Sequence, residues 1–194
     1  MKRKKKWFDY LWIAEIVYLS LGFFNILFAW LGLCMFLLPL IMAIGGWDKL
    51  YCNRYCGRGQ LFSLLGSSLA LSRWNNMPAF MRSRAFRYGF LLFFMLMFAN
   101  MLCATWLVFS GARDLQQVVT LLWTFRLPWH WAYTGTAEAW VAQFAFGFYS
   151  IMLTSTTLGL LSLLLWKPRS WCVYCPMGTM TQTICRIKHG NENS

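Results

Sequence analysis

Long apolar stretches, in which Glu15 is the only charged residue, are the feature that most constrains what this chain can fold into. Three of them, residues 10–46, 88–110 and 140–166, contain almost only apolar side chains. A helix needs about 20 such residues to cross a bilayer, so the second and third stretches each predict one membrane span. Hydrophobic residues make up 59% of the 194 residues and charged residues 12%. A soluble fold of this size cannot bury that much apolar surface, which excludes a water-soluble enzyme.

The first stretch is too long for one crossing. Its 37 residues would form a helix of about 55 Å, whereas the hydrocarbon core is about 30 Å thick. We therefore predict a tight turn near residues 29–32 and two short spans, 10–28 and 33–46. Together with 88–110 and 140–166, these spans predict an all-α membrane protein with four transmembrane helices.

The basic residues support four spans and set the orientation. Sixteen of the 18 Lys and Arg residues then fall on one side, and only Arg113 and Arg126 lie in the loop between the third and fourth spans. Lys and Arg gather on the cytoplasmic side, so we expect a multi-pass protein of the cell (inner) membrane with both termini cytoplasmic. Topology and contact with anionic membrane lipid account for the formal charge of +12 without nucleic acid as a partner.

The loop between the third and fourth spans also has a helical pattern. Its apolar side chains recur at helical spacing, which predicts a helix lying in the outer interface, followed by an aromatic belt. The helical set is Leu115, Val118, Val119, Leu122 and Trp123, and the belt is Trp129, Trp131 and Tyr133.

Cysteines carry the main functional signal. Cys34 and Cys103 stand alone in apolar spans and are typical of small packing residues. The other five lie on the predicted cytoplasmic side, where thiols stay reduced, so metal binding or redox chemistry is favoured over structural disulfides. These five are Cys52, Cys56, Cys172, Cys175 and Cys185.

Two of the cysteine segments look like copies of one unit. Residues 51–59 read Y-C-N-R-Y-C-G-R-G and residues 171–178 read W-C-V-Y-C-P-M-G. Each follows a predicted two-helix hairpin, so the single membrane domain divides into halves 1–87 and 88–194, related by a pseudo-two-fold axis along the membrane normal. Such halves would bring four thiolates together at the cytoplasmic face, from Cys52, Cys56, Cys172 and Cys175. In this alignment Tyr51 matches Trp171, Tyr55 matches Tyr174, Cys56 matches Cys175, and Gly59 matches Gly178.

Four thiolates suit an iron–sulfur cluster or a structural zinc ion. Gly57 and Gly59 favour a cluster, because they allow close approach and leave backbone N–H groups free to bond to sulfur. Pro176 directly follows a cysteine, as in ferredoxin motifs. A zinc scaffold or assembly protein and a thiol–disulfide transducer remain as alternatives. Aromatic residues are expected to shield the site from water, namely Tyr51, Tyr55, Trp171 and Tyr174.

These segments resemble the membrane iron–sulfur proteins of the NapH/NosR type. The family module follows a membrane helix with C-x-x-x-C-P and a Gly-containing helix start. C-N-R-Y-C-G-R-G-Q-L-F-S-L-L-G matches it with Gly57 where proline is usual, and C-V-Y-C-P-M-G keeps the proline but has one residue fewer between its cysteines. The resemblance covers the architecture of nearly the whole chain, while its specific residues are confined to these two segments.

The resemblance implies an electron-transfer protein without its own soluble ferredoxin domain. Electrons would pass from a cytoplasmic donor or the quinone pool toward a membrane or extracytoplasmic acceptor, through a 4Fe–4S cluster or a 2Fe–2S cluster on the same cysteines. The chain is then a redox subunit that depends on partner proteins, with no catalytic residues of a stand-alone enzyme. Basic loops around Arg54, Arg58 and Arg73 would steer an acidic ferredoxin- or flavodoxin-like donor.

Three further residues are weaker candidates. Cys185 is either an additional ligand or, as we favour, an unligated thiol on a short interfacial helix. Glu15 lies inside the first span, where it can pair with the basic run at residues 2–6 or take part in proton uptake or quinone binding. His130 lies between two tryptophans, where it is either a belt residue or a hydrogen-bond donor to a quinone or flavin carbonyl.

Overall fold

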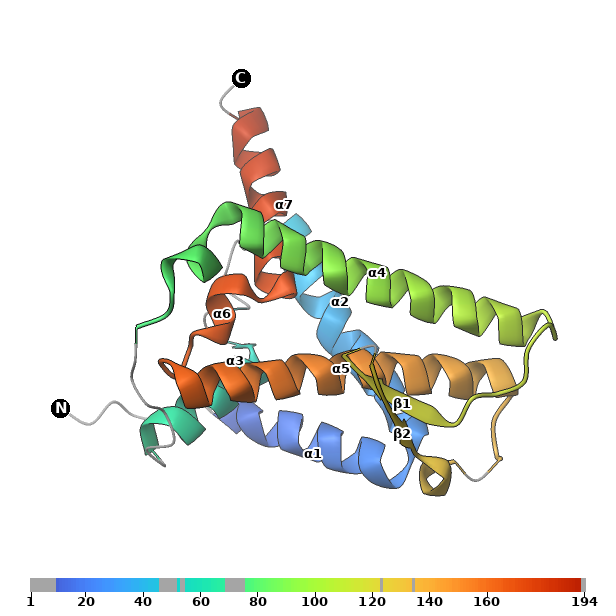
Figure 1. The fold of residues 1–194 in the computed structure, drawn as a ribbon. Coiled ribbons are helices and arrows are strands. Elements are labelled where there is room, and N and C mark those ends of the chain that lie inside the picture. Colours follow the sequence, from blue (N-terminus) through green and yellow to red (C-terminus); the bar gives the residue numbers. More distant parts are fainter. Residues whose placement is uncertain are drawn as a thin grey trace. The chain divides into compact units, whose positions relative to one another are not determined.

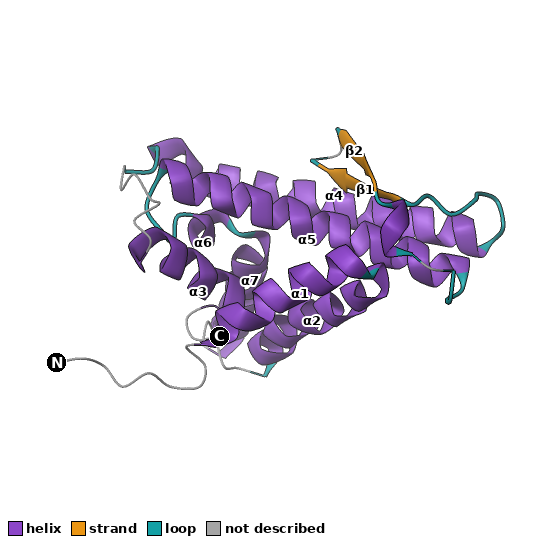
Figure 2. Cartoon of the chain, turned by 90° about the horizontal axis from the view of Figure 1, so that it is seen from below, coloured by secondary structure: helices purple, strands orange, loops and turns teal. Residues whose placement is uncertain are grey.

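The computed structural model describes residues 10–45, 52, 55–68, 76–122, 124–133 and 135–192. Helices make up most of the described chain, and its strands form one short hairpin (Figures 1 and 2). In chain order the elements are α1 (Leu11–Phe24), η2 (Ile26–Ala29), α2 (Trp30–Ile44), α3 (Gly57–Ser63), η4 (Leu64–Ser68), η5 (Ala79–Arg82), α4 (Arg84–Phe109), β1 (Val118–Leu121), β2 (Phe125–Pro128), η6 (His130–Ala132), α5 (Ala139–Leu165), α6 (Trp171–Tyr174) and α7 (Pro176–Glu192).

Three helical stretches of the described chain are long and apolar enough to cross a membrane. They are Ile26–Ile44, Arg84–Phe109 and Ala139–Leu165, while α1 is apolar but has only 14 residues. The predicted helical protein with membrane-type helices is therefore confirmed. A fourth span and the side on which the termini lie stay predictions.

The break in the first apolar stretch occurs at Asn25, so the predicted turn at residues 29–32 is wrong. Asn25 is extended, with φ −144° and ψ 116°, and its side-chain oxygen accepts the N–H of Leu27 at 3.0 Å. An asparagine can thus end one helix and cap the next, because its side chain replaces a backbone partner. Gly32 lies within α2, where an added Cβ would collide with Tyr18 and Phe148. That glycine therefore allows close packing and makes no turn.

The loop after α4 forms an antiparallel hairpin, so the predicted interfacial helix is wrong. In β1 and β2, Val119 pairs with Leu127 and Thr120 with Arg126. The segment contains consecutive β-branched residues, Val118, Val119 and Thr120, which favour a strand over a helix when a neighbour satisfies the backbone.

A row of polar side chains on α5 supplies that neighbour. Gln143, Ser150 and Thr154 follow one another by seven and four positions, which places them on one face of the helix. Each accepts a backbone N–H of the loop: Gln116 N to Gln143 Oε1 at 2.9 Å, Thr120 N to Ser150 Oγ at 2.9 Å, and Leu122 N to Thr154 Oγ1 at 3.3 Å. The strand is therefore held by tertiary hydrogen bonds that the loop sequence alone does not contain.

The chain divides into two compact units. The first unit comprises residues 1–16, 36–91 and 158–194, and the second comprises 17–35 and 92–157. Each unit draws segments from both predicted sequence halves, and those halves themselves stay a prediction. Four helices (α1, α2, α4 and α5) each contribute one end to each unit.

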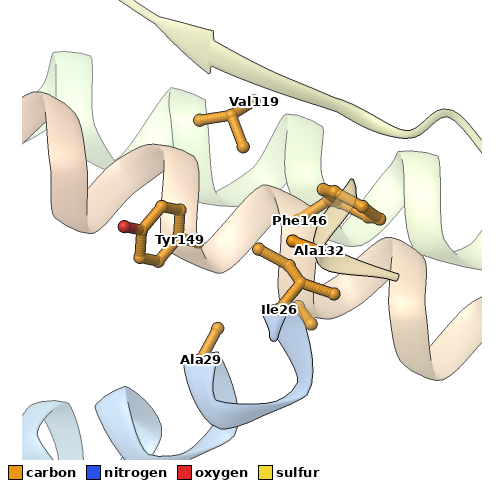
Figure 3. Packing of buried hydrophobic residues seen from close by; sticks show 7 residues of the cluster. Ile26, Ala29, Val119, Ala132, Phe146 and Tyr149 are labelled. Carbon is orange, nitrogen blue, oxygen red and sulfur yellow. The ribbon is translucent and has the colours of Figure 1, made fainter. Parts of the chain in front are cut away.

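The second unit has a core of small and aromatic residues. Its buried members include Ile26, Ala29, Val119, Phe146 and Tyr149, shown in Figure 3. The Tyr149 hydroxyl donates to the carbonyl oxygen of Leu19 at 2.9 Å. Alanine at this contact lets segments approach closely, as in membrane helix packing generally.

Candidate functional site

The two cysteine motifs of the first unit share a local structure. Cys56 caps the N-terminus of α3 in an extended conformation, with φ −72° and ψ 102°. Cys175 directly precedes α7, which begins at Pro176. The aligned glycines, Gly59 and Gly178, are each the third residue of the helix that follows. In both motifs the chain therefore turns from a cysteine straight into a helix.

Gly59 brings thiols of the two motifs to one place. Its backbone N–H donates to Cys56 Sγ at 3.4 Å. A Cβ added at Gly59 would lie 3.6 Å from Cys56 Sγ and 3.7 Å from Cys172 Sγ. Two sulfurs from distant parts of the sequence therefore lie beside the same buried glycine, which leaves the space between them free of a side chain.

Cys52 and Cys175 lie close enough to act electrostatically on this pair. Both raise the pKa of Cys56, and both raise the pKa of Cys172. Cys52 Sγ also lies 4.0 Å from the hydroxyl oxygen of Thr181, a buried residue of α7. Among the residues that the structure describes, no group of three or more His, Cys, Asp and Glu side chains is already arranged to hold a metal ion. The four predicted ligands are therefore neighbours without forming a closed coordination shell.

Burial keeps the Cys56 thiol protonated: it raises the pKa of this thiol from 9.0 to about 11, and the neighbouring Cys175 and Cys52 add to the effect. Cys172 is an exposed residue, and the pKa of its thiol is raised by desolvation and by the neighbouring Cys56 and Cys175. The Gly59 N–H and the Arg58 guanidinium act in the opposite direction on Cys56. A cation that binds thiolates would relieve this penalty, so the donor set and its surroundings fit a thiolate-ligated metal or cluster.

We expect the Cys56 thiol to be unreactive in the metal-free protein. A pKa of about 11 gives about a hundredfold less thiolate near pH 8 than an ordinary value of 9.0. Alkylation by iodoacetamide, followed peptide by peptide with mass spectrometry, should be slow at Cys56 until the protein is denatured. The folded state holds this proton more tightly than the unfolded state, so the stability of the metal-free protein should fall as pH rises from 9.0 toward 11. Fast labelling in the folded protein would contradict this and favour thiol–disulfide exchange.

A buried ion pair lies beside the first motif. Arg58 Nη2 is 2.7 Å from Glu15 Oε1, and the side chains are 16% and 5% exposed. Glu15 therefore pairs with Arg58, a partner not predicted from the sequence; the predicted pairing with residues 2–6 concerns a run outside the described residues. Arg58 is also wrong as part of an exposed docking surface, because its guanidinium is paired and largely buried. The other two arginines of that prediction, at positions 54 and 73, lie outside the described residues.

Gly57 brings the first motif against the backbone of α1. A Cβ at this position would lie 2.6 Å from the carbonyl oxygen of Leu11. Any larger residue, proline included, would collide there, which explains why glycine stands where the resemblance leads us to expect proline. Gly57 and the Arg58–Glu15 pair together hold α1 against the cysteine segment.

Aromatic side chains pack beside the second motif. Trp171 and Tyr174 are 3% and 5% exposed, and the Tyr174 hydroxyl hydrogen-bonds to Ser162. Both rings contact Phe90 of α4 edge-on, with centroids 5.6 Å and 5.1 Å away. Phe86 adds an edge-on contact to Tyr174 at 5.6 Å. Sequence reasoning missed the two phenylalanines, since nothing in the cysteine motifs indicates which face of a distant helix packs there.

The remaining candidates are Cys185, His130, Tyr55 and Tyr51. Cys185 is 9% exposed on α7, a helix of 17 residues, so the short interfacial helix that we predicted is wrong. His130 is exposed in η6 of the second unit, with its Nδ1 3.1 Å from Gln117 Oε1. Tyr55 is half-buried, and Tyr51 lies outside the described residues.

Comparisons with protein-family models, with curated proteins and with solved structures give no match to this chain. The NapH/NosR-type resemblance therefore stays a hypothesis based on the two cysteine segments.

Proposed function

We propose that this protein is a membrane-embedded iron–sulfur electron-transfer protein whose cluster is held by Cys52, Cys56, Cys172 and Cys175. The observation that carries the proposal is the approach of Cys56 Sγ and Cys172 Sγ to Gly59, within 3.6 Å and 3.7 Å of the position of its missing Cβ. Thiols from both motifs then share one space, with the other two cysteines of the motifs nearby.

The chain's own residues have distinct roles in this proposal. The cysteines supply thiolates, and the Gly59 N–H stabilises negative charge on Cys56 Sγ. Arg58 supplies positive charge beside Cys56, and the aromatic residues around Trp171 and Tyr174 exclude water. A bound cluster would supply one-electron chemistry, with a potential set by its charge, hydrogen bonds and exposure.

The placement of helix ends supports a multi-pass arrangement. The first unit contains the start of α1, the end of α2, the start of α4 and the end of α5, together with both cysteine motifs. Four spans with both termini on one side would produce this alternation. We therefore infer a protein of the inner membrane whose cysteine site lies on the cytoplasmic side. The donor is a ferredoxin- or flavodoxin-like protein or quinone, and the acceptor is a membrane or extracytoplasmic protein.

Metal analysis tests the proposal directly. Protein purified anaerobically in mild detergent should contain iron and acid-labile sulfide in matching amounts and give an EPR signal after reduction with dithionite. Cys172→Ala should abolish that signal, because it removes a ligand. Cys34→Ala is the matched control, since Cys34 is an exposed residue of α2 that belongs to the second unit.

Other metal contents would identify the alternatives. Zinc without iron or colour would indicate a structural site of four cysteine ligands and contradict the electron-transfer proposal. A metal-free protein in which Cys56 reacts rapidly would indicate a thiol–disulfide transducer.

A further inference from the structure

A basic pocket between α4 and α7 has no role in the proposed cluster site. Both helices contribute to it, and all of its lining residues belong to the first unit. Three of them are arginines, and a tyrosine and threonines add hydroxyl groups. The lining includes Arg84, Arg87 and Tyr88 from α4, and Gln182, Thr183 and Arg186 from α7.

The three arginines have no carboxylate among the described side chains. Glu15 is paired with Arg58, and Asp114 and Glu138 belong to the second unit. Like charges that line one pocket repel each other, and an anion between them turns this repulsion into attraction. The three positive charges therefore favour the binding of a negatively charged ligand in this pocket.

Arg87 shows an unused donor at this site. Its Nη2 donates to Gln182 Oε1, but its Nε is buried and has no hydrogen-bond partner among the described residues. A buried donor without an acceptor is costly, so an acceptor from outside the chain would stabilise this arrangement. The guanidinium presents its donors as a planar fork that matches phosphate oxygens. The hydroxyls of Tyr88 and Thr183 are already engaged with the protein: Thr183 Oγ1 donates to the carbonyl oxygen of Thr179 at 3.0 Å, and Tyr88 hydrogen-bonds to Thr183, so the arginines supply the donors for the ligand.

The pocket lies where a span meets polar surroundings. Arg84 is the first residue of α4, a 26-residue helix apolar enough to cross a membrane. The N-terminal turn of a helix adds positive potential, and basic pockets between membrane helices at this level bind lipid headgroups.

We propose that this pocket binds the phosphate group of an anionic phospholipid. The ligand joins α4 to α7, the helix that follows Cys175 and carries Thr181 beside Cys52. Bound lipid therefore stabilises the helix that supports the cysteine site.

Thermal unfolding of the full chain in non-ionic detergent tests the proposal without any metal readout. As short-chain phosphatidylglycerol is added at fixed ionic strength, the midpoint temperature of unfolding should rise and then reach a plateau. Phosphatidylcholine should have no such effect. The double variant R84Q/R186Q should weaken the phosphatidylglycerol effect at least about tenfold, because two charge-assisted contacts are lost. R82Q/R113Q removes the same charge from exposed positions outside the pocket and should titrate like the parent chain.

Each outcome is decisive. Equal responses to the two lipids, or an unchanged titration of R84Q/R186Q, would overturn the proposal. Binding of inorganic phosphate alone, with the same dependence on Arg84 and Arg186, would keep the phosphate site and assign it to a soluble ligand. Repeating the titration on Cys172→Ala separates this inference from the proposed cluster, which that variant lacks.

Discussion

Glu15→Gln is expected to lower the free energy of unfolding by about 3–5 kcal/mol, the usual cost of removing one partner of a buried ion pair. The substitution keeps the shape of the side chain but leaves the Arg58 guanidinium, 16% exposed, without its counter-charge. Because Arg58 follows Gly57, which packs on α1, the loss should also loosen the first cysteine motif. Thermal unfolding in detergent should show a lowered midpoint, together with reduced metal content.

The matched control is Glu138→Gln, which removes an exposed carboxylate from just before α5. It should leave the free energy of unfolding within about 0.5 kcal/mol of the parent value, as is usual for surface substitutions. The double variant E15L/R58M should recover most of the lost stability, because apolar residues of similar volume commonly replace a buried ion pair without loss. A Glu15→Gln protein as stable as Glu138→Gln would show that the pair does not support the fold.

Gly59→Ala is expected to reduce cluster content at least about tenfold while leaving the protein folded. The new methyl group would lie 3.6 Å and 3.7 Å from two sulfurs, an ordinary contact distance in the metal-free protein. It would nevertheless occupy the space beside both thiols in which the proposed cluster is held. Iron, sulfide and EPR amplitude per protein, measured beside the unfolding midpoint, separate loss of the site from loss of the fold.

Gly89→Ala is the matched control for this variant. An added Cβ at Gly89 in α4 meets nothing within 4 Å, so the exchange adds a methyl group to a helix without touching the cysteines. Both variants should keep or slightly raise helix stability, since alanine favours helix more than glycine does. Full iron content and an unchanged EPR signal in Gly59→Ala would show that the cluster is held elsewhere.

Local sequence signals predicted the elements that depend on local physics. The long apolar stretches predicted membrane-type helices, because the free energy of moving a helix from water into a bilayer depends on the composition and length of the stretch. The family resemblance, and not local physics, implied that each cysteine motif runs into a Gly-containing helix, and α3 and α7 begin directly after Cys56 and Cys175. The break in the first stretch was foreseen, but its position depended on one side chain, Asn25, that bonds to its own backbone.

The loop after α4 shows where local pattern fails. Leu115, Val118, Val119 and Leu122 recur at helical spacing, yet the loop forms strands. The pattern shows which side chains are apolar. It does not show which acceptors form hydrogen bonds with the backbone N–H groups. Ser150 and Thr154 on α5 take two of them, from Thr120 and Leu122, which lie 30 and 32 positions away.

By itself, the sequence determined the helical class, the long apolar stretches and the identity of the four thiol candidates, because residue type and spacing fix these. Only the tertiary structure decided that Glu15 meets Arg58, that Gly59 lies beside two thiols, and that arginines of α4 and α7 line one pocket. Such contacts join segments far apart in the chain. Their geometry follows from how helices pack, which no local window of residues specifies.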